Sequence, residues 1–369
     1  SDTGAAIATA VGAFLVATGR LEVWHVYLIA AAAGTAGAFQ APAFTASVTL
    51  LVDKRHYARA SGMRQASDAL EAIAVPVMAG MLLGVVGLVG IIVIDLATFV
   101  VAVSTVLAVR IPNPPRPASA EDEADLRGLR AALYGLRYIG ARRGLLAMLL
   151  YFAVVNFVAN TAGVLLAPMV LSFSDARGLG LVQMVSGISM LGGSVLISVW
   201  GGPERKMLAV YFALAVSALG FVVAGLNASV LVVSCGVALM FVLIPVGSGS
   251  AVAIWQRKVD PAVQGRVFAA RGMISTGMMP IAFAITGPLA DRVFQPLMHG
   301  AAPPPALLTA LVGTGAGRGY ALMLVAAGGG LILATLVFSL YRPLRRVDEE
   351  LPDFVDPEVQ ADAVLRAER

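Results

Sequence analysis

Charge is what this sequence has least of. Only 13% of its 369 residues are Asp, Glu, Lys or Arg, whereas 59% are hydrophobic, and the mean hydropathy is +0.85. A water-soluble domain carries about a quarter charged residues, because its surface must be solvated. The shortage of charge excludes a soluble globular protein, so lipid must be the main solvent of this chain. We predict an all-α integral membrane protein.

Cysteine and histidine are also scarce. The single cysteine, Cys235, excludes an intramolecular disulfide and a Cys-based metal site. The histidines His25, His56 and His299 lie far apart, and no HExxH, GxSxG or Cys/His cluster occurs. The glycine-rich segment 313–319 lacks the Walker lysine and a preceding strand. We therefore expect no metal, no cofactor and no enzymatic activity.

The apolar runs are long enough to cross a bilayer as helices, which takes about 20 residues each. Strands are excluded because open strands would leave backbone groups unpaired in lipid, and the runs do not alternate as in a barrel. The predicted spans are 4–19, 24–50, 62–86, 90–109, 144–171, 179–200, 207–226, 229–255, 267–290 and 319–341.

Positive charge falls on one side of this arrangement. Of the 26 Lys and Arg residues, all but Arg20, Arg177, Arg292 and Arg318 lie on the same side. An excess of Lys and Arg marks the cytoplasmic side of a membrane protein. Basic cytoplasmic loops therefore explain the net charge of +4, and no nucleic-acid-binding function is needed to explain it. We expect a multi-pass protein of the cell membrane with both ends of the chain in the cytoplasm.

One connection differs from the rest. Residues 111–125, IPNPPRPASAEDEAD, are proline-rich and acidic, which predicts a flexible linker. In the following segment 126–143, leucines recur at helical spacing. Two interpretations fit: a helix lying on the inner membrane face, or an extension of the next span. The predicted domains are 1–110 (four spans), 111–142 (linker), 143–342 (six spans) and 343–369 (charged cytoplasmic tail).

The segments GAFQAPAFTASVTLLVDKRHYARASG, VPVMAGMLLG and IIVIDLATF resemble the major facilitator superfamily. They are most similar to its drug:proton antiporter branch, which holds macrolide-efflux-like and siderophore-exporter-like proteins. The matching residues are Pro42, Ala43 and Ala46 in the fourth span, Pro76 and Gly80 in the fifth, and Asp95 in the sixth. Val75 and Ala79 replace two glycines of the fifth-span motif.

This resemblance implies a helical bundle of two six-helix halves, of which ten of twelve spans are present. The chain would then lack the first two spans, and either those helices or a fused upstream domain would be its partner.

Three charges lie together at the start of one span. Asp68 and Glu71 are three residues apart and share a helix face, and Arg64 precedes Asp68 by four. An ionised carboxylate at this depth costs about 2.5–3.5 kcal/mol. We favour an Arg64–Asp68 ion pair at the cytoplasmic rim and a proton-coupling role for Glu71, with Asp68 as a second candidate. The alternative is that Glu71 turns back to the ion pair.

Pro76 should kink its helix, because proline lacks the N–H donor. Gly80 and Gly84 form a GxxxG face suited to close helix contact. The resemblance implies a gate contact with the other half near the outer side; a packing kink is the alternative. Arg271 occupies the position in its span that Arg64 occupies in its own, which suggests a pair of cytoplasmic gate residues or two membrane anchors.

Four polar side chains and one methionine inside spans are candidates for a substrate cavity. The candidates are Gln40, Asn156, Asn160, Ser234 and Met240. The resemblance places Asn156 and Asn160 on a cavity-lining span, whereas interhelical hydrogen bonding is the alternative for each polar side chain. For Asp95 we favour a structural role at the outer interface.

The predicted function is secondary active efflux of a hydrophobic or amphiphilic small molecule, by proton antiport with alternating access. Its partners would be the lipophilic substrate, protons and membrane lipids. Two other classes stay open: a non-transporting anchor or scaffold fragment of a larger protein, and an importer or lipid flippase on the same fold.

Overall fold

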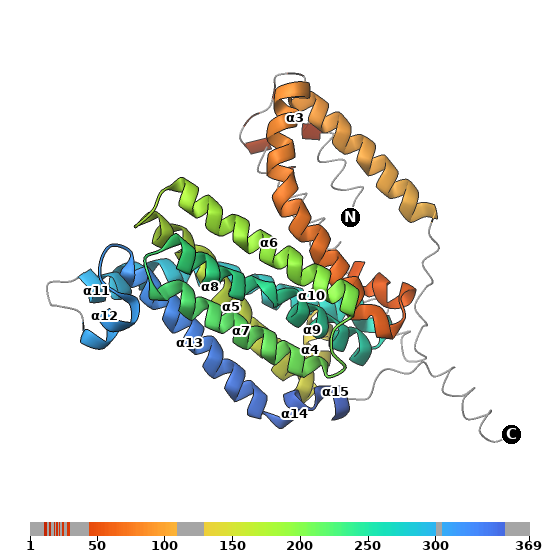
Figure 1. Ribbon diagram of the computed structural model, residues 1–369. Coiled ribbons are helices and arrows are strands. Elements are labelled where there is room, and N and C mark those ends of the chain that lie inside the picture. The colour runs from red at the N-terminus through yellow and green to blue at the C-terminus, as the bar shows by residue number, and fades with distance from the viewer. Residues whose placement is uncertain are drawn as a thin grey trace.

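The computed structural model describes residues 44–108, 129–299 and 305–350, together with isolated residues before 44. Within these ranges the protein is helical and has no strand, which confirms the all-α prediction. Figure 1 shows the long helices from α5 to α13 lying side by side as a bundle. We call residues 44–108 the N-terminal part and residues 129–350 the C-terminal part.

The helices follow one another with short connections. After the helical residues 44–51, the elements are η1 (Lys54–His56), α3 (Tyr57–Ala108), α4 (Leu129–Gly140), α5 (Arg143–Leu171), α6 (Ala176–Trp200), α7 (Lys206–Leu226), α8 (Val230–Val242), α9 (Ile244–Lys258), α10 (Pro261–Leu289), the π-helical η2 (Ala290–Phe294), α11 (Gln295–His299), α12 (Ala306–Val312), α13 (Arg318–Leu340), α14 (Arg342–Arg345) and α15 (Val347–Glu350).

The last six predicted spans are present as helices long and apolar enough to cross a membrane. They are α5, α6, α7, α8 with α9, α10 with η2 and α11, and α13. The predicted spans 62–86 and 90–109 both fall within α3 apart from the last residue. Nearly all of the predicted spans 4–19 and 24–50 lies outside the described residues.

The helical backbone angles of α3 are interrupted at Gly87. Gly87 has φ 66° and ψ −178°, which are the non-helical angles within this helix. Glycine adopts positive φ without the steric cost that a Cβ imposes, so the chain can turn between two spans there. Figure 1 shows the two parts of α3 running in different directions from this bend. Pro76, Gly80 and Gly84 lie on α3, but their contacts, and with them the predicted gate contact, fall outside what the structure describes.

The segment after the linker forms a helix of its own. The helix α4 ends at Gly140, and α5 begins at Arg143 after an extended residue, so α4 does not continue into the span. It packs closely on α10: a Cβ at Gly135 would lie 2.4 Å from the carbonyl oxygen of Arg266. Ile139 is fully buried in the core beside it.

Three clusters of buried side chains hold the bundle together. One lies around Met148, Tyr151 and Trp255, and a second around Leu165, Phe221 and Leu324. The third joins α3 to the C-terminal part: Tyr57 and Ala58 pack there against Ile197, Val246 and Ala253. Burial of apolar side chains therefore fixes the first turn of α3 against α6 and α9.

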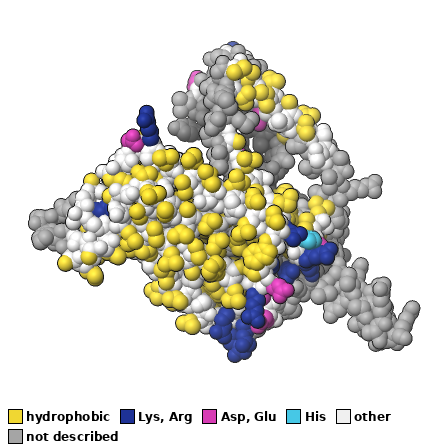
Figure 2. Space-filling view, viewed as in Figure 1, with side chains coloured by type: hydrophobic (Ala, Val, Ile, Leu, Met, Phe, Trp, Pro, Cys, Tyr) yellow, Lys and Arg dark blue, Asp and Glu magenta, His cyan; other side chains and the backbone are white. Residues whose placement is uncertain are grey.

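Lys and Arg side chains gather at one end of the bundle (Figure 2). We call this the cation-rich end; it includes Lys54, Arg55, Arg59, Lys206, Arg257, Lys258 and Arg345. It comprises η1, the start of α7, the end of α9 and α14. The described loops that the charge count assigns to one side of the membrane therefore also lie together in space.

The crossing of α7 and α8 depends on glycine. A Cβ at Gly236 would lie 2.4 Å from the backbone nitrogen of Ala224 and 2.7 Å from its Cα. Because these are backbone atoms, a larger residue must push the helices apart, and such overpacking costs about 1–3 kcal/mol. We predict that Gly236→Ala lowers the midpoint temperature of thermal unfolding in detergent.

The matched control is Gly329→Ala on an exposed part of α13, where no described atom lies within 4 Å of the new Cβ. Alanine favours a helix over glycine by about 1 kcal/mol. The unfolding midpoint of this variant should therefore equal or exceed that of the parent. Equal midpoints for the two variants would contradict the close crossing.

Candidate functional site

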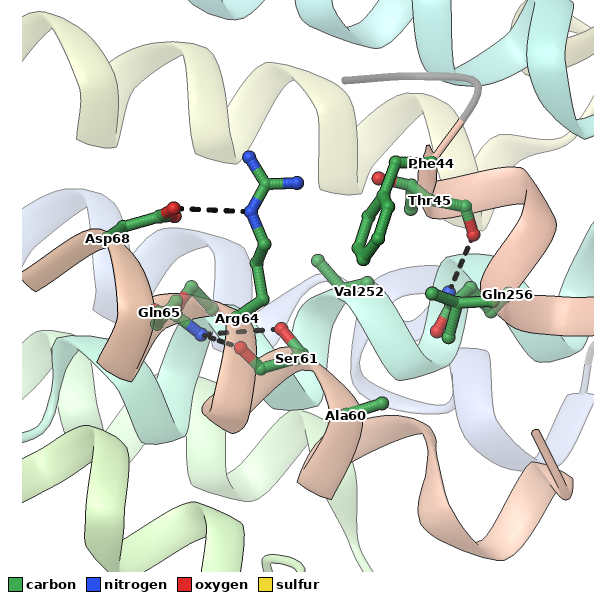
Figure 3. A pocket seen from close by; sticks show the side chains of 11 residues that line it. Phe44, Thr45, Ala60, Ser61, Arg64, Gln65, Asp68, Val252 and Gln256 are labelled. Carbon is green, nitrogen blue, oxygen red and sulfur yellow. Dashed lines mark hydrogen bonds and ion pairs between the residues drawn. The ribbon is translucent and has the colours of Figure 1, made fainter. Parts of the chain in front are cut away.

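A cleft of about 300 Å³ lies where the N-terminal part meets α9. It is lined by Phe44, Thr45 and Val48 from the helical residues 44–51, by Ala60, Ser61, Arg64, Gln65 and Asp68 from α3, and by Ser248, Val252 and Gln256 from α9. Figure 3 shows these side chains converging from the helices on either side. Its volume is at the lower end of the range for small-molecule sites, about 300–1,000 Å³.

An ion pair lies on the α3 side of the cleft. Arg64 Nε donates to Asp68 Oδ1 at 3.2 Å, which confirms the pair expected from the i, i+4 spacing. The Arg64 guanidinium also lies 5.0 Å from the centre of the Phe44 ring. Figure 3 labels both side chains at the cleft. The side chains of Arg64 and Asp68 are 43% and 48% exposed, so both charges remain accessible from the cleft.

Gln65 joins α3 to the start of α9. Its Nε2 donates to the backbone oxygens of Ser61 at 3.2 Å and Pro245 at 3.4 Å. Its Oε1 accepts from Ser248 Oγ at 2.5 Å. Sequence reasoning missed this residue, although a glutamine next to Arg64 at the start of a span was a signal for a polar contact.

Two further glutamines hold the helical residues 44–51 against the C-terminal part. Gln264 is fully buried; its Nε2 donates to the backbone oxygens of Gln256 and Val259, and its Oε1 accepts from Thr49 Oγ1 at 2.8 Å. Gln256 Nε2 donates to the backbone oxygen of Thr45 at 3.1 Å. We call Gln65, Gln256 and Gln264 with these partners the glutamine contact.

Glu71 lies one turn beyond Asp68 and does not line the cleft. Its side chain is exposed, and it makes no hydrogen bond or ion pair within the part of the chain that the structure describes. The alternative in which Glu71 turns back to the Arg64–Asp68 pair is therefore not what the structure shows.

The asparagine side chains bond within their own helix. Asn156 Nδ2 donates to the backbone oxygen of Phe152, and Asn160 Nδ2 donates to that of Asn156, both at 2.7 Å. Asn156 lines a small space of about 20 Å³ together with Trp255 and Arg271. The Arg271 guanidinium lies 5.7 Å from the Trp255 ring, so Arg271 and Arg64 do not share one cavity wall.

The remaining candidates lie elsewhere. Met240 is 3% exposed and belongs to the core cluster around Phe221, so the structure does not place its side chain at a cavity. Ser234 is half-buried on α8, away from the cleft lining. Asp95 is exposed on α3, and Gln40 lies outside the described residues.

Comparison with known proteins gives a consistent result. Residues 3–284 match the family model of the Major Facilitator Superfamily. The macrolide efflux protein A of Streptococcus pyogenes is 27% identical over 280 residues, which cover 74% of this chain and 68% of that protein. The macrolide efflux protein A of Enterococcus faecalis is 27% identical over 267 residues, or 71% of this chain and 81% of that protein.

We predict that the Arg64–Asp68 pair contributes little to stability. Exposed ion pairs are worth about 0–1 kcal/mol, because water already solvates both charges. Asp68→Asn and Arg64→Gln should therefore unfold within a few degrees of the parent in detergent. Asp53→Asn, which removes the exposed Arg55–Asp53 pair outside the cleft, is the matched control. A large fall in midpoint for the cleft variants alone would mean that the pair is structural.

Proposed function

Because this chain belongs to the major facilitator superfamily, we propose that it exports a hydrophobic or amphiphilic small molecule across the cell membrane, by proton antiport with alternating access. Both relatives described above are macrolide efflux proteins, which supports export and makes a macrolide the first substrate to test. The observation that carries the proposal is the cleft, because both parts of the chain build it.

The cleft has the chemistry that an amphiphile needs. Phe44, Val48 and Val252 offer apolar surface, whereas Arg64 and Asp68 offer charges of both signs on one side. Small-molecule sites combine a mainly apolar lining with a few placed polar groups in this way. A molecule with an apolar body and one charged or polar group would contact both parts of the chain at once.

Alternating access requires that the two parts separate at one end. The glutamine contact consists of neutral hydrogen bonds, and each contributes about 1 kcal/mol net, since water replaces it on opening. Such a contact can close the cation-rich end without locking it. The charge rule assigns that end to the cytoplasm, so this arrangement would be closed toward the cytoplasm.

Proton coupling needs a carboxylate that can change its charge during the cycle. Glu71 has no cation partner among the described residues, so protonation there breaks no ion pair. Asp68 would have to release Arg64 first. An ionised carboxylate within a span is costly, at about 2.5–3.5 kcal/mol, and Glu71 lies within α3. We therefore assign proton coupling to Glu71. The role that we assign to Asp68 is to open and close the ion pair with Arg64.

The test is macrolide-driven proton flux in proteoliposomes. The parent should move protons when a macrolide gradient is applied, and Glu71→Gln should abolish this flux while macrolide binding persists. Glu349→Gln, an exposed carboxylate on α15, is the matched control and should transport normally. Full coupling in Glu71→Gln would remove Glu71 from the mechanism, and no macrolide-dependent flux in the parent would remove the macrolide as a substrate.

The direction of transport is measured separately, in intact cells. Expression of an exporter lowers the cellular content of labelled macrolide, and dissipating the proton gradient restores it. An importer on the same fold would raise the content instead, and a scaffold would leave it unchanged. Either of these results would contradict the proposed export.

A further inference from the structure

A second pocket, of about 310 Å³, lies at the cation-rich end and is separate from the cleft. Arg55, His56 and Arg59 line it from η1 and α3, Trp200, Gly201, Gly202, Glu204 and Lys206 from the α6–α7 connection, and Arg257 from α9. The N-terminal and C-terminal parts thus each contribute basic side chains to one pocket.

The pocket has a surplus of positive charge. Four Lys and Arg residues face a single acidic lining residue, Glu204. Arg55 also contacts Asp53 at 3.4 Å, but both side chains are largely exposed, so that pair is weak. A further acid, Asp348, interacts with Lys206 and Arg257, and its Oδ2 accepts from the backbone N–H of Met207 at 3.0 Å.

Asp348 does not cancel this surplus. Burial raises the pKa of the Asp348 carboxyl, and the neighbouring Lys258, Arg257 and Lys206 act against that rise. Its single charge is shared among three cations and is already engaged with the start of α7. Arg55 and Arg59, on the other wall of the pocket, are not among the groups that interact with it.

Two cationic side chains, the buried Lys206 and the half-buried Arg257, line the pocket from the C-terminal part. Lys206 is only 8% exposed, and its Nζ donates to the backbone oxygen of Gly201 at 3.3 Å. Arg257 donates to the backbone oxygen of Lys54 at 3.4 Å, but its Nε is buried and has no hydrogen-bond partner in the described structure. An ammonium group carries three N–H donors, so Lys206 can bind an acceptor anion and keep its bond to Gly201.

The connection between α6 and α7 keeps the pocket open. Gly201 and Gly202 both have positive φ, 82° and 76°, which residues with a Cβ rarely adopt. A Cβ at Gly201 would lie 2.9 Å from Arg59 Nε, and one at Gly202 would lie 3.7 Å from Lys206 Nζ. The two glycines thus allow the cations from both walls to approach the same space.

We propose that this pocket binds a phosphate group, and that the bound phosphate bridges the N-terminal and C-terminal parts at the cation-rich end. Guanidinium groups match the geometry of phosphate oxygens, and a compact ammonium adds a point charge. Trp200 at the rim is 55% exposed, as is typical of side chains at the membrane–water interface. The phosphate could come from an anionic lipid headgroup or from free phosphate.

Binding has a consequence for conformation. A ligand that contacts both parts binds better when they are close together, so it shifts the population toward the arrangement closed at this end. It also raises stability against unfolding, since the unfolded chain offers no such pocket. This inference does not depend on the export of any substrate.

The experiment titrates the purified full chain in dodecyl maltoside micelles and follows the midpoint of thermal unfolding. The probes are phosphatidylglycerol, zwitterionic phosphatidylcholine and inorganic phosphate. We expect phosphatidylglycerol to raise the midpoint in a saturable way and phosphatidylcholine not to. A matching rise with inorganic phosphate would identify free phosphate as sufficient; a rise with phosphatidylglycerol alone would identify the lipid. No saturable rise with either anion would overturn the proposal.

Variants locate the effect in the pocket. Arg59→Gln and Arg257→Gln should each weaken the apparent affinity for the effective anion about fivefold, which corresponds to about 1 kcal/mol per cation near the membrane surface. Arg137→Gln removes an exposed charge in the last turn of α4, outside the pocket, and should bind as the parent does. An equal loss in Arg137→Gln, or no loss in the pocket variants, would show nonspecific charge attraction and contradict the site.

Discussion

The contact between the two parts of the chain is the constraint on which the rest of the structure depends. It has two components. One is the glutamine contact, and the other is the close approach of α3 to α6, where a Cβ at Gly62 would lie 2.5 Å from Ile197 Cγ2. Side-chain amides can donate and accept without carrying charge. Their hydrogen bonds therefore join the two parts at the cation-rich end without the desolvation cost of buried ion pairs.

The cleft and the basic pocket are both built at this contact. The cleft is walled by Gln65, Ser248 and Gln256, which take part in the glutamine contact themselves. The basic pocket is formed by η1 and the start of α3, by the α6–α7 connection, and by the end of α9. Separating the two parts would therefore change both sites together, which would connect a small molecule in one to an anion in the other through a single equilibrium.

Local features of the sequence were sufficient for much of this architecture. Apolar length predicted the last six spans, and i, i+4 spacing predicted the Arg64–Asp68 pair. The glutamine contact joins residues such as Thr49 and Gln264 that are 215 positions apart, and no local pattern encodes such a pairing. Met240 shows the same limit, because a methionine in a span suits a core and a cavity equally well. The bend at Gly87 depends on a backbone conformation that glycine permits without requiring it.

The most direct measurement is a reversible cross-link across the contact. Thr49 and Gln264, whose side-chain oxygens lie 2.8 Å apart, are replaced by cysteine (T49C and Q264C), and the native Cys235 by alanine, C235A. We predict that an oxidant or a short bifunctional reagent joins T49C to Q264C and that transport then stops. A reductant, or cleavage of the reagent, should restore transport. Transport at the parental rate while the two positions remain joined would contradict the account.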